Sequence, residues 1–488
     1  MKRTLSIVAL LLITIVLGAV PIRILHTNDS HGSYIPQKSK QGAWSGYATL
    51  EYYLNQERSA SKRTLYLDAG DQQTGSVFAS LPFKSAIGGA VIESFNLLKL
   101  DASTFGNHEF DQSQANTIQL NKLANYPFIS TNLQTQDGKP FGGVPYKIFS
   151  LDSLKVGVFG FTLTELPEKV RHESIAGLKI LPYKQALDKY LDEVDKQTDL
   201  IILLTHIGYE ADSLLATSLD NRVDLIIGGH SHVFIDNPMQ VNGIYIASAG
   251  SHLSALGKLD LDVVNDRIET IQYNMIPLMV PETMPKTPLS AFIQTIADSL
   301  ETELGKTIAN LPEAWIPDKF QETIVSRWLA EALKAEYSDP YKPDLALINC
   351  GGIRKAIPAG PLTLQDMHEL LPFNNYVVLF SCYGRDLLTM DALNKQHAID
   401  KPYDILQSSA TGWIEQNCPG GHEHKKQIYE INGKTLDPDQ VYRVVSHDYV
   451  LDQWDKYLGF QPFAAVETGD LFLDAMIRQV MGSESLRQ

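Results

Sequence analysis

Cysteine is scarce in this sequence, and several other features that mark particular protein classes are missing. Only 3 of the 488 residues are Cys, so the chain is not a disulfide-stapled scaffold, although a bridge between Cys382 and Cys418 stays open in an oxidising compartment. No internal repeat or low-complexity tract occurs. Beyond one stretch near the N-terminus, no apolar run is long enough to span a bilayer.

A net positive charge is also lacking. The chain holds 41 Lys and Arg against 57 Asp and Glu, a formal net charge of −16. Binding to nucleic acid or to anionic lipid needs an excess of Lys and Arg, so neither a nucleic-acid polymer nor a membrane surface is expected as a partner. A small phosphate-bearing molecule remains compatible, provided that metals or a few Arg reverse the sign of the charge locally.

What is present describes a globular protein. Hydrophobic residues make up 44% and charged residues 20% of the chain, which excludes a disordered, collagen-like or coiled-coil protein. A length of 488 residues predicts two to four domains.

The first residues form a separate segment. Lys2 and Arg3 precede an apolar stretch at residues 5–17, and the small residues Gly18 and Ala19 follow it. This order predicts a secretory signal peptide at residues 1–19, with an uncleaved anchor as the alternative. We therefore expect an exported protein, periplasmic or secreted to the cell surface, that has no stable membrane insertion after cleavage.

Short apolar runs alternate with helical patterns along residues 20–280, which is typical of an α/β domain. Strands are expected at residues 21–27, 64–68, 156–161, 199–205, 223–227 and 244–249, helices at 48–59, 88–99 and 183–194, and two antiparallel strands at 257–264 and 267–274. A proline-rich stretch then leads into a linker and hinge helix at residues 281–305, with the helix itself expected at 289–304. Residues 306–488 form a second, smaller α/β domain.

Polar side chains collect where the expected strands end. A carboxylate with an imidazole suits a divalent metal, and the strand ends of an open α/β sheet are where ligands bind. The absence of thiolates argues against a structural zinc site. The candidate metal ligands are Asp29, His31, Asp71, Asn107, His206, His230 and His232.

Two of these segments predict further roles. Asp71 follows Gly70 and has two oxygens, so it can bridge two cations about 4 Å apart. His108 follows Asn107 and could meet the substrate, and Asp111 can reach the other ring nitrogen of His108 if a helix begins there.

The order D-x-H, G-D, G-N-H-E, T-H and G-H-S-H resembles the calcineurin-like metallophosphoesterase superfamily, and LHTNDSHG at residues 25–32 resembles the 5′-nucleotidase family of exported, two-domain enzymes. The resemblance implies a four-layer β-sandwich flanked by helices, followed by a substrate-binding α/β domain. It implies that His108 assists catalysis with support from Asp111. It assigns the ligands to two metals, Asp29, His31, Asp71 and His232 for one, and Asp71, Asn107, His206 and His230 for the other.

The second domain carries weaker signals. Residues 344–354 predict a strand, a Gly-rich turn and an Arg, which suits phosphate or carboxylate binding, although a tight turn with a solvated Arg is the plainer interpretation. The segment resembles the nucleotide-binding part of the family, which also implies that aromatic residues sandwich the base. The substrate-binding residues implied are Asn349, Arg354, Phe373, Tyr449, Asp455 and Lys319.

Some positions depart from the family pattern. Cys350 replaces a Gly, Lys319 stands where an Arg usually binds phosphate, and Gln453 begins a turn that is Gly-rich in the family. The residues 418–424 look like a metal loop but are better explained as a solvated turn, and we expect His252 to be structural or to lie behind the ligands.

The sequence therefore predicts a two-metal phosphohydrolase that converts a nucleoside 5′-monophosphate and water into nucleoside and phosphate, by in-line attack of a metal-activated hydroxide. Nitrogen and oxygen ligands favour Zn or Mn, with Fe and Co also compatible. The alternatives are a UDP-sugar or nucleotide diphosphatase, a 2′,3′-cyclic nucleotide phosphodiesterase, a thiosulfohydrolase, and a secreted nucleotide-binding protein without catalysis. The split of metal and specificity residues between two domains predicts a site completed by domain closure, and the oligomeric state stays open.

Overall fold

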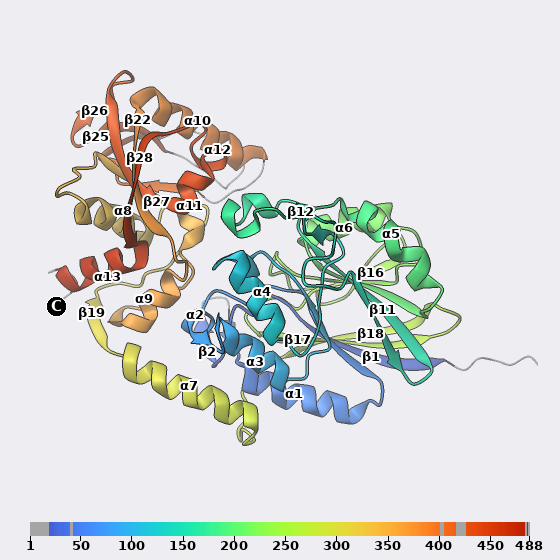
Figure 1. Cartoon of the computed structure of the whole chain (residues 1–488). Coiled ribbons are helices and arrows are strands. Elements are labelled where there is room, and N and C mark those ends of the chain that lie inside the picture. The colour runs from blue at the N-terminus through green and yellow to red at the C-terminus, as the bar shows by residue number, and fades with distance from the viewer. Residues whose placement is uncertain (1–18, 40–41, 401–404, 416–425, 484–485, 487–488) are drawn as a thin grey trace, which may run out of the picture.

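The chain folds into two domains, each built on its own β-sheets and its own hydrophobic core (Figure 1). The computed structural model describes residues 19–39, 42–400, 405–415, 426–483 and 486. Residues 1–18 of the expected signal peptide, Cys418 and the turn at 418–424 lie outside the described residues.

The first six-stranded sheet holds the N-terminal strand at its middle. Its strands in spatial order are β18 (Ile268–Pro277), β17 (Ala255–Val263), β1 (Val20–Thr27), β4 (Thr64–Asp68), β7 (Ala102–Thr104) and β8 (Phe128–Ile129). Strands β1, β4, β7 and β8 run parallel to one another, whereas β17 pairs antiparallel with both β1 and β18. The two antiparallel strands predicted from the sequence therefore close one edge of the sheet begun by β1.

The second six-stranded sheet has a parallel centre and antiparallel edges. Its strands in spatial order are β10 (Tyr146–Leu151), β11 (Leu154–Thr162), β13 (Leu200–His206), β14 (Leu225–Gly228), β16 (Ile244–Ala247) and β15 (Met239–Val241). The six buried strands predicted from the sequence all exist, with ends that differ by one or two residues.

The two sheets pack face to face. Apolar side chains from one sheet, such as Ile24 and Leu67, share a single buried cluster with Val158 and Ile202 from the other. Because side chains alternate along a strand, the other face of each sheet is free to carry helices. The predicted β-sandwich flanked by helices is confirmed.

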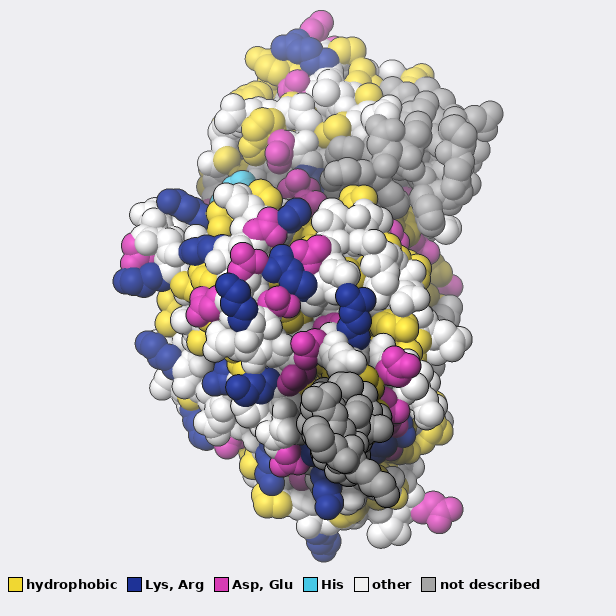
Figure 2. Space-filling view, turned by 90° about the vertical axis from the view of Figure 1, so that its right-hand side faces the viewer, with side chains coloured by type: hydrophobic (Ala, Val, Ile, Leu, Met, Phe, Trp, Pro, Cys, Tyr) yellow, Lys and Arg dark blue, Asp and Glu magenta, His cyan; other side chains and the backbone are white. Residues whose placement is uncertain are grey.

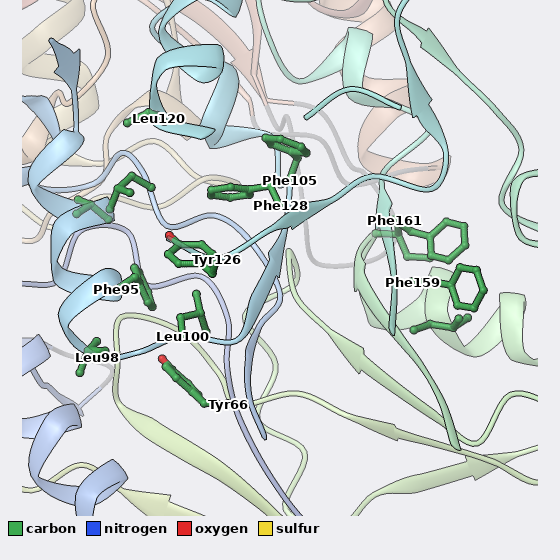
Figure 3. Close-up of a cluster of buried hydrophobic side chains, with 14 of the residues drawn as sticks. Tyr66, Phe95, Leu98, Leu100, Phe105, Leu120, Tyr126, Phe128, Phe159 and Phe161 are labelled. Carbon is green, nitrogen blue, oxygen red and sulfur yellow. The ribbon is translucent and has the colours of Figure 1, made fainter. Parts of the chain in front are cut away.

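Helices and loops cover the outer faces. The helices of this domain are α1 (Tyr47–Ala60), α2 (Val77–Ser80), α3 (Gly89–Leu97), α4 (Gln114–Leu123), α5 (Tyr183–Asp195) and α6 (Tyr209–Ser218). Aromatic rings fill the space under α3 and α4, where Phe105 stacks on Phe128 at 4.8 Å and Tyr126 lies 5.4 Å from Phe128 (Figure 3). This core fixes the strand ends that carry the functional loops.

Helix α7 (Pro288–Leu304) runs beside α1 and α3 before the chain enters the second domain (Figure 1). It begins at a capping box, in which Thr287 Oγ1 accepts a hydrogen bond from Ser290 N at 3.0 Å and Ser290 Oγ accepts one from Thr287 N at 2.8 Å. The helix predicted at residues 289–304 is thus present.

The second domain is built on a five-stranded sheet of mixed direction. Its strands in spatial order are β23 (Leu406–Ser408), β20 (Leu345–Asn349), β27 (Val441–His447), β22 (Tyr376–Tyr383) and β28 (Phe463–Leu471). Smaller strands are β19 (Thr307–Leu311), β21 (Gly360–Thr363), β24 (Gly412–Glu415), β25 (Lys426–Ile431) and β26 (Lys434–Thr435). Its helices are α8 (Ile324–Glu336), α9 (Leu364–Leu370), α10 (Gly384–Asp400), α11 (Asp448–Asp452), α12 (Trp454–Tyr457) and α13 (Phe472–Gly482). Separate hydrophobic clusters cover the two faces of this sheet.

Charged side chains of both signs lie on the surface of the protein (Figure 2). On the face shown in Figure 2, basic side chains lie interspersed among acidic ones. Among the described residues, none of the helices combines the length and the apolar character that a membrane crossing needs.

Candidate metal centre and active site

Expected metal ligands lie in the loops after β1, β4 and β7 of the first sheet and β14 of the second, and at His206, the last residue of β13. Because these strands run parallel within their sheets, the polar loops that follow them meet at the same edge of the sandwich. The structure brings all seven expected ligands together in overlapping groups: Asp29, His31 and His232; His31, Asp71 and His108; Asp71, His206 and His230, with Asn107 beside His230.

The first group lies around Asp29. His31 Nε2 is 3.0 Å from His232 Nε2, and His232 Nε2 is 3.4 Å from Asp29 Oδ1. Donors that share one ion at about 2.1 Å lie roughly 3.0–3.4 Å apart in octahedral or tetrahedral geometry. The spacing of these three atoms fits a single divalent cation.

The second group lies around Asp71. His206 Nε2 is 3.1 Å from Asp71 Oδ2, and His230 Nδ1 is 3.0 Å from Asn107 Oδ1. Asp71 also belongs to a group with His31, so its carboxylate lies between the two sets of donors. That position fits a carboxylate that bridges two ions.

The ring orientations favour metal binding as well. His31 Nδ1 lies 3.1 Å from the carbonyl oxygen of Thr74, and His206 Nδ1 lies 2.8 Å from that of Ala69. A carbonyl oxygen only accepts hydrogen bonds, so each Nδ1 carries a proton and Nε2 is the atom left to bind a metal. Although burial lowers the pKa of His206, Asp71 raises it to about 10, so a metal at this Nε2 displaces a proton. Nε2 of His206 is buried near the Asp71 carboxylate without a well-aligned hydrogen bond, an arrangement that a cation between the two groups explains.

Electrostatics keep the acids charged and two of the imidazoles neutral. Burial by itself raises the pKa of Asp71, but His206 and His108 outweigh it and hold that pKa well below its usual value. Burial, followed by repulsion from His206, lowers the pKa of His230 to about 3. Burial likewise holds the pKa of His31 well below its usual value. These are the protonation states that metal ligands need.

Two glycines let the loops come close to the ligands. A Cβ on Gly106 would clash with the carboxylate of Asp71, and one on Gly229 would lie 2.9 Å from His206 Nδ1. Only glycine therefore allows the loops after β7 and β14 to approach the ligands so closely.

Glu109 holds two of these loops together. Its carboxylate accepts hydrogen bonds from the backbone N–H of Gly106, Asp71 and Gln72 at 2.7, 3.1 and 2.8 Å. Burial and then the neighbouring Asp71 raise its pKa to about 7, while the backbone donors lower it. The sequence predicts no role for Glu109, although its place directly after His108 in the motif is a signal.

His108 lies at the start of a 3₁₀ turn, His108–Phe110, beside the donor cluster. Its Nδ1 is 2.6 Å from Asp111 Oδ2, and its Nε2 is 3.9 Å from Asp71 Oδ2. Although burial lowers the pKa of His108, Asp111 and Asp71 together raise it above its usual value. The ring is therefore oriented by one carboxylate and directed with its other nitrogen toward the ligands.

The second domain reaches the same place. The ring of Phe373 lies 5.9 Å from that of His108, and the guanidinium of Arg354 lies 5.9 Å from the centre of the Phe373 ring. Two of the residues expected to bind substrate thus face the expected catalytic residue across the domain boundary.

The other expected substrate residues occupy different positions. Asn349 is buried at the end of β20, and its Nδ2 lies 3.5 Å from the hydroxyl of Tyr457. Tyr449, on α11, reaches the carbonyl oxygen of Glu168 in the first domain at 3.5 Å. Asp455 is exposed on α12, and Lys319 is exposed with its carbonyl oxygen bonded to Ile405 N.

The two domains of the chain match two different protein families. The family described as calcineurin-like phosphoesterase matches residues 22–234, and the family described as 5′-nucleotidase, C-terminal domain, matches residues 301–463. The 5′-nucleotidase of Vibrio cholerae is 26% identical over 473 residues, which span 86% of this chain and 83% of that protein.

The chain belongs to the 5′-nucleotidase family.

Solved structures share the whole fold. The 5′-nucleotidase precursor of Thermus thermophilus superposes with a TM-score of 0.81 at 21% identity, over 96% of this chain and 99% of that one. The sulfate thiohydrolase SoxB of Thermus thermophilus gives 0.77 at 17% identity, over 94% of each chain. Membership of the 5′-nucleotidase family makes this protein a metal-dependent phosphoester hydrolase.

One further histidine lies at this centre of the 5′-nucleotidase fold. The ring of His252 is 5.0 Å from that of His31 and 5.8 Å from that of His232, and its backbone N–H donates to Asp29 O at 2.7 Å. From the sequence, His252 is expected to be structural or to lie behind the ligands. The structure places it beside them, because the loop after β16 turns back toward Asp29.

Proposed function

We propose that this protein hydrolyses nucleoside 5′-monophosphates to nucleoside and phosphate. The observation that supports the proposal is the meeting of the two domains, where Phe373 and Arg354 face His108 and the metal donors. A single domain offers either metal donors or an aromatic and cationic surface, whereas a nucleotide needs both.

The metal ligands proposed are those that the resemblance implies. One ion is held by Asp29, His31, Asp71 and His232, and the other by Asp71, Asn107, His206 and His230. When bound, such a pair lowers the pKa of a water molecule and polarises the phosphoryl oxygen. The nitrogen and oxygen donors favour Zn or Mn, with Fe and Co also compatible, and elemental analysis of the purified protein identifies them.

The side chains of the protein orient the substrate. His108, aligned by Asp111, donates a hydrogen bond to the phosphoryl group and stabilises the charge that develops on it. Arg354 binds the phosphate, and Phe373 and Tyr449 stack on the base. Asn349, Lys319 and Asp455 complete the proposed set of substrate contacts, each from the second domain.

A substrate panel tests the proposal. Phosphate release is measured from AMP, UDP-glucose, 2′,3′-cyclic AMP and an aryl phosphate, each before and after chelation. We expect AMP to give the highest kcat/KM, lost on chelation and restored by Zn or Mn. A preference for UDP-glucose or for the cyclic nucleotide would instead favour a diphosphatase or a cyclic nucleotide phosphodiesterase on the same fold. A protein that is metal-free and cannot be reloaded would favour the non-catalytic binding protein.

The site of action is proposed from the N-terminal segment. Residues 1–19 are a signal peptide in this proposal, and the mature enzyme acts on nucleotides in the periplasm or at the cell surface. N-terminal sequencing of the mature protein from culture fractions tests this, with cleavage near Ala19 as the expected result.

A further inference from the structure

A single guanidinium connects the two domains beside the expected catalytic turn. Arg171 Nη2 donates to the carbonyl oxygens of Asp111 and Gln112 at 3.1 and 3.4 Å, and Arg171 Nη1 lies 3.6 Å from Asp448 Oδ2 in the second domain. Its Nη1 also lies 3.7 Å from the exposed carboxylate of Glu173. The side chains of Arg171 and Asp448 are only 14% and 11% exposed.

The carbonyls that Arg171 binds belong to the turn that positions His108. At the beginning of this turn, His108 N donates to Asp71 Oδ1 at 2.8 Å. At its end, Asp111 holds the imidazole at 2.6 Å, and Arg171 binds the backbone of Asp111 itself. The turn is therefore fixed at one end by a metal donor and at the other by Arg171.

The second domain also contacts Gln112, at the end of this turn, and the residues just before Arg171. Asn374 Nδ2 donates to Gln112 Oε1 at 2.8 Å. Gln453, which replaces a glycine of the family pattern, is buried, and its Nε2 donates to the carbonyl oxygens of Pro167 and Val170 at 3.0 and 3.3 Å. In Figure 1, α11, which begins at Asp448, lies on the side of the second domain that faces the first.

We propose that Arg171 is a positioning residue for the His108–Asp111 pair, and that Asp448 makes this position depend on the engagement of the second domain. The groups that Arg171 contacts are the carbonyl oxygens of Asp111 and Gln112 and the carboxylates of Glu173 and Asp448, none of them a proposed metal donor. Arg171 acts by holding the backbone of Asp111, so that the imidazole of His108 faces the phosphoryl group only when both domains are in place. The inference rests on the proposed role of His108 in phosphoester hydrolysis.

The test compares Arg171→Met, Arg171→Lys and Asp448→Asn with the wild type in the metal-loaded, full-length protein. For Arg171→Met we expect kcat to fall at least tenfold for both AMP and an aryl phosphate, with a change in KM below threefold. Arg171→Lys recovers part of kcat, because lysine keeps the charge but not the planar set of donors. Asp448→Asn gives a smaller loss, and Arg171→Met/Asp448→Asn is no slower than Arg171→Met.

A double-mutant cycle separates positioning from a general structural role. In an Asp111→Ala background, Arg171→Met should lower kcat by less than twofold, because the carboxylate that passes the backbone position on to His108 is gone. The matched control is Arg222→Met, since Arg222 pairs with the exposed Asp192 and Asp220 away from the turn. Its kcat should equal that of the wild type.

Three results would overturn the inference. These are a wild-type kcat in folded Arg171→Met, equal losses in the presence and absence of Asp111, or a KM effect in place of a kcat effect. If Arg171→Met does not fold, Asp448→Asn and Arg171→Lys decide, and wild-type values in both overturn it. Failure of the proposed function is recognised separately, because the wild type would then hydrolyse the aryl phosphate but not AMP.

Discussion

Five of the seven donor residues have a backbone in the left-handed region, which non-glycine residues seldom adopt. Their φ angles are 50° for Asp29, 49° for His31, 54° for Asp71, 77° for His230 and 56° for His232. Such conformations cost about 1–3 kcal/mol each and persist where the surroundings impose them, typically at functional sites. His252, with a φ of 53°, shares this property with the donors around it.

Replacement of His108 by Ala should slow the chemistry and leave the metals in place. His108 aligns on Asp111 and is not one of the seven proposed ligands, so its loss removes charge stabilisation only. We expect kcat to fall about 10²–10⁴-fold. The measurement is kcat for AMP together with metal content by elemental analysis. Wild-type turnover would remove the assigned role.

Glu109→Gln should weaken metal binding. The carboxylate accepts backbone N–H groups with both oxygens, and an amide NH₂ in place of one oxygen would face donors instead of binding them. Outer contacts of this kind are worth about 10–100-fold in metal affinity. Competition with a fluorescent chelator measures the affinity. An unchanged affinity in a folded variant would show that the loops hold their shape without Glu109.

Asp224 should make stability depend on pH. Burial raises its pKa to about 7 in the folded protein, although its Oδ2 accepts a hydrogen bond from Ile201 N at 2.8 Å. Between about pH 4 and 7 the carboxyl group of Asp224 keeps its proton in the folded state but has lost it in the unfolded state. The unfolding free energy of the protein therefore falls as the pH rises through this range. Relative to the wild type, Asp224→Asn should gain roughly 1–2 kcal/mol of unfolding free energy between pH 5 and pH 8.

Urea unfolding at the two pH values measures this difference. Asp188→Asn is the matched control, because Asp188 is exposed on α5 and its carboxylate pairs with Lys184. Equal pH dependence of wild type and Asp224→Asn would contradict the prediction.

At the scale of elements, the arrangement of strands explains where the chemistry lies. Parallel strands of both sheets deliver their C-terminal loops to one edge, and the packed core between the sheets holds these loops in place. The antiparallel strands β17 and β18 widen the sheet beside β1 and carry none of the seven donors.

The cap of α7 stabilises the beginning of the helix that leads into the second domain. Thr287 Oγ1 accepts a hydrogen bond from Ser290 N and donates to Glu51 Oε2 at 2.5 Å, which ties α7 to α1. Thr287→Ala should lower the unfolding free energy by about 1–2 kcal/mol. Chemical denaturation measures it.

Thr295→Ala serves as the control for the cap. Thr295 is exposed in the middle of α7 and its hydroxyl donates to the carbonyl oxygen of Ala291 within the same helix, so its replacement should be neutral or slightly stabilising. Equal losses for the two variants would show that the loss at Thr287 does not come from the cap.

For the whole molecule, an acidic chain still builds a site for a phosphate ester. The net charge is −16, yet the donor cluster collects imidazoles from two sheets, and Arg354 approaches it from the second domain. The local field at the site is therefore set by a few groups and by the metals that the donors can hold.

Removal of the metals should lower activity and stability together. Without cations, buried carboxylates and imidazoles face one another with unmatched charges and lone pairs. Ligands at roughly 100–1,000 times their Kd stabilise the native state by about 3–4 kcal/mol. Thermal unfolding and AMP hydrolysis, measured after chelation and after reloading with Zn or Mn, check this. Full activity at zero metal content would contradict it.

The sequence by itself determined the fold class, most of the buried strands of the first domain and the candidate donor residues. Hydrophobic periodicity encodes buried strands locally, and motif residues such as Asp71 and His230 are recognisable without knowledge of their neighbours. The short strand β7 and the edge strand β10 were not predicted, because short or half-exposed strands lack a clear apolar pattern.

Only the tertiary structure decided which distant residues meet. The loop of His252 folds back on Asp29, the Glu109 carboxylate gathers N–H groups from two loops, and Arg171 reaches Asp448 across the domain boundary. Each of these contacts joins residues that lie far apart in the chain, and two of them involve backbone groups, which every residue type carries. The packing of sheets and domains creates these contacts, so a linear pattern of residue types does not contain them.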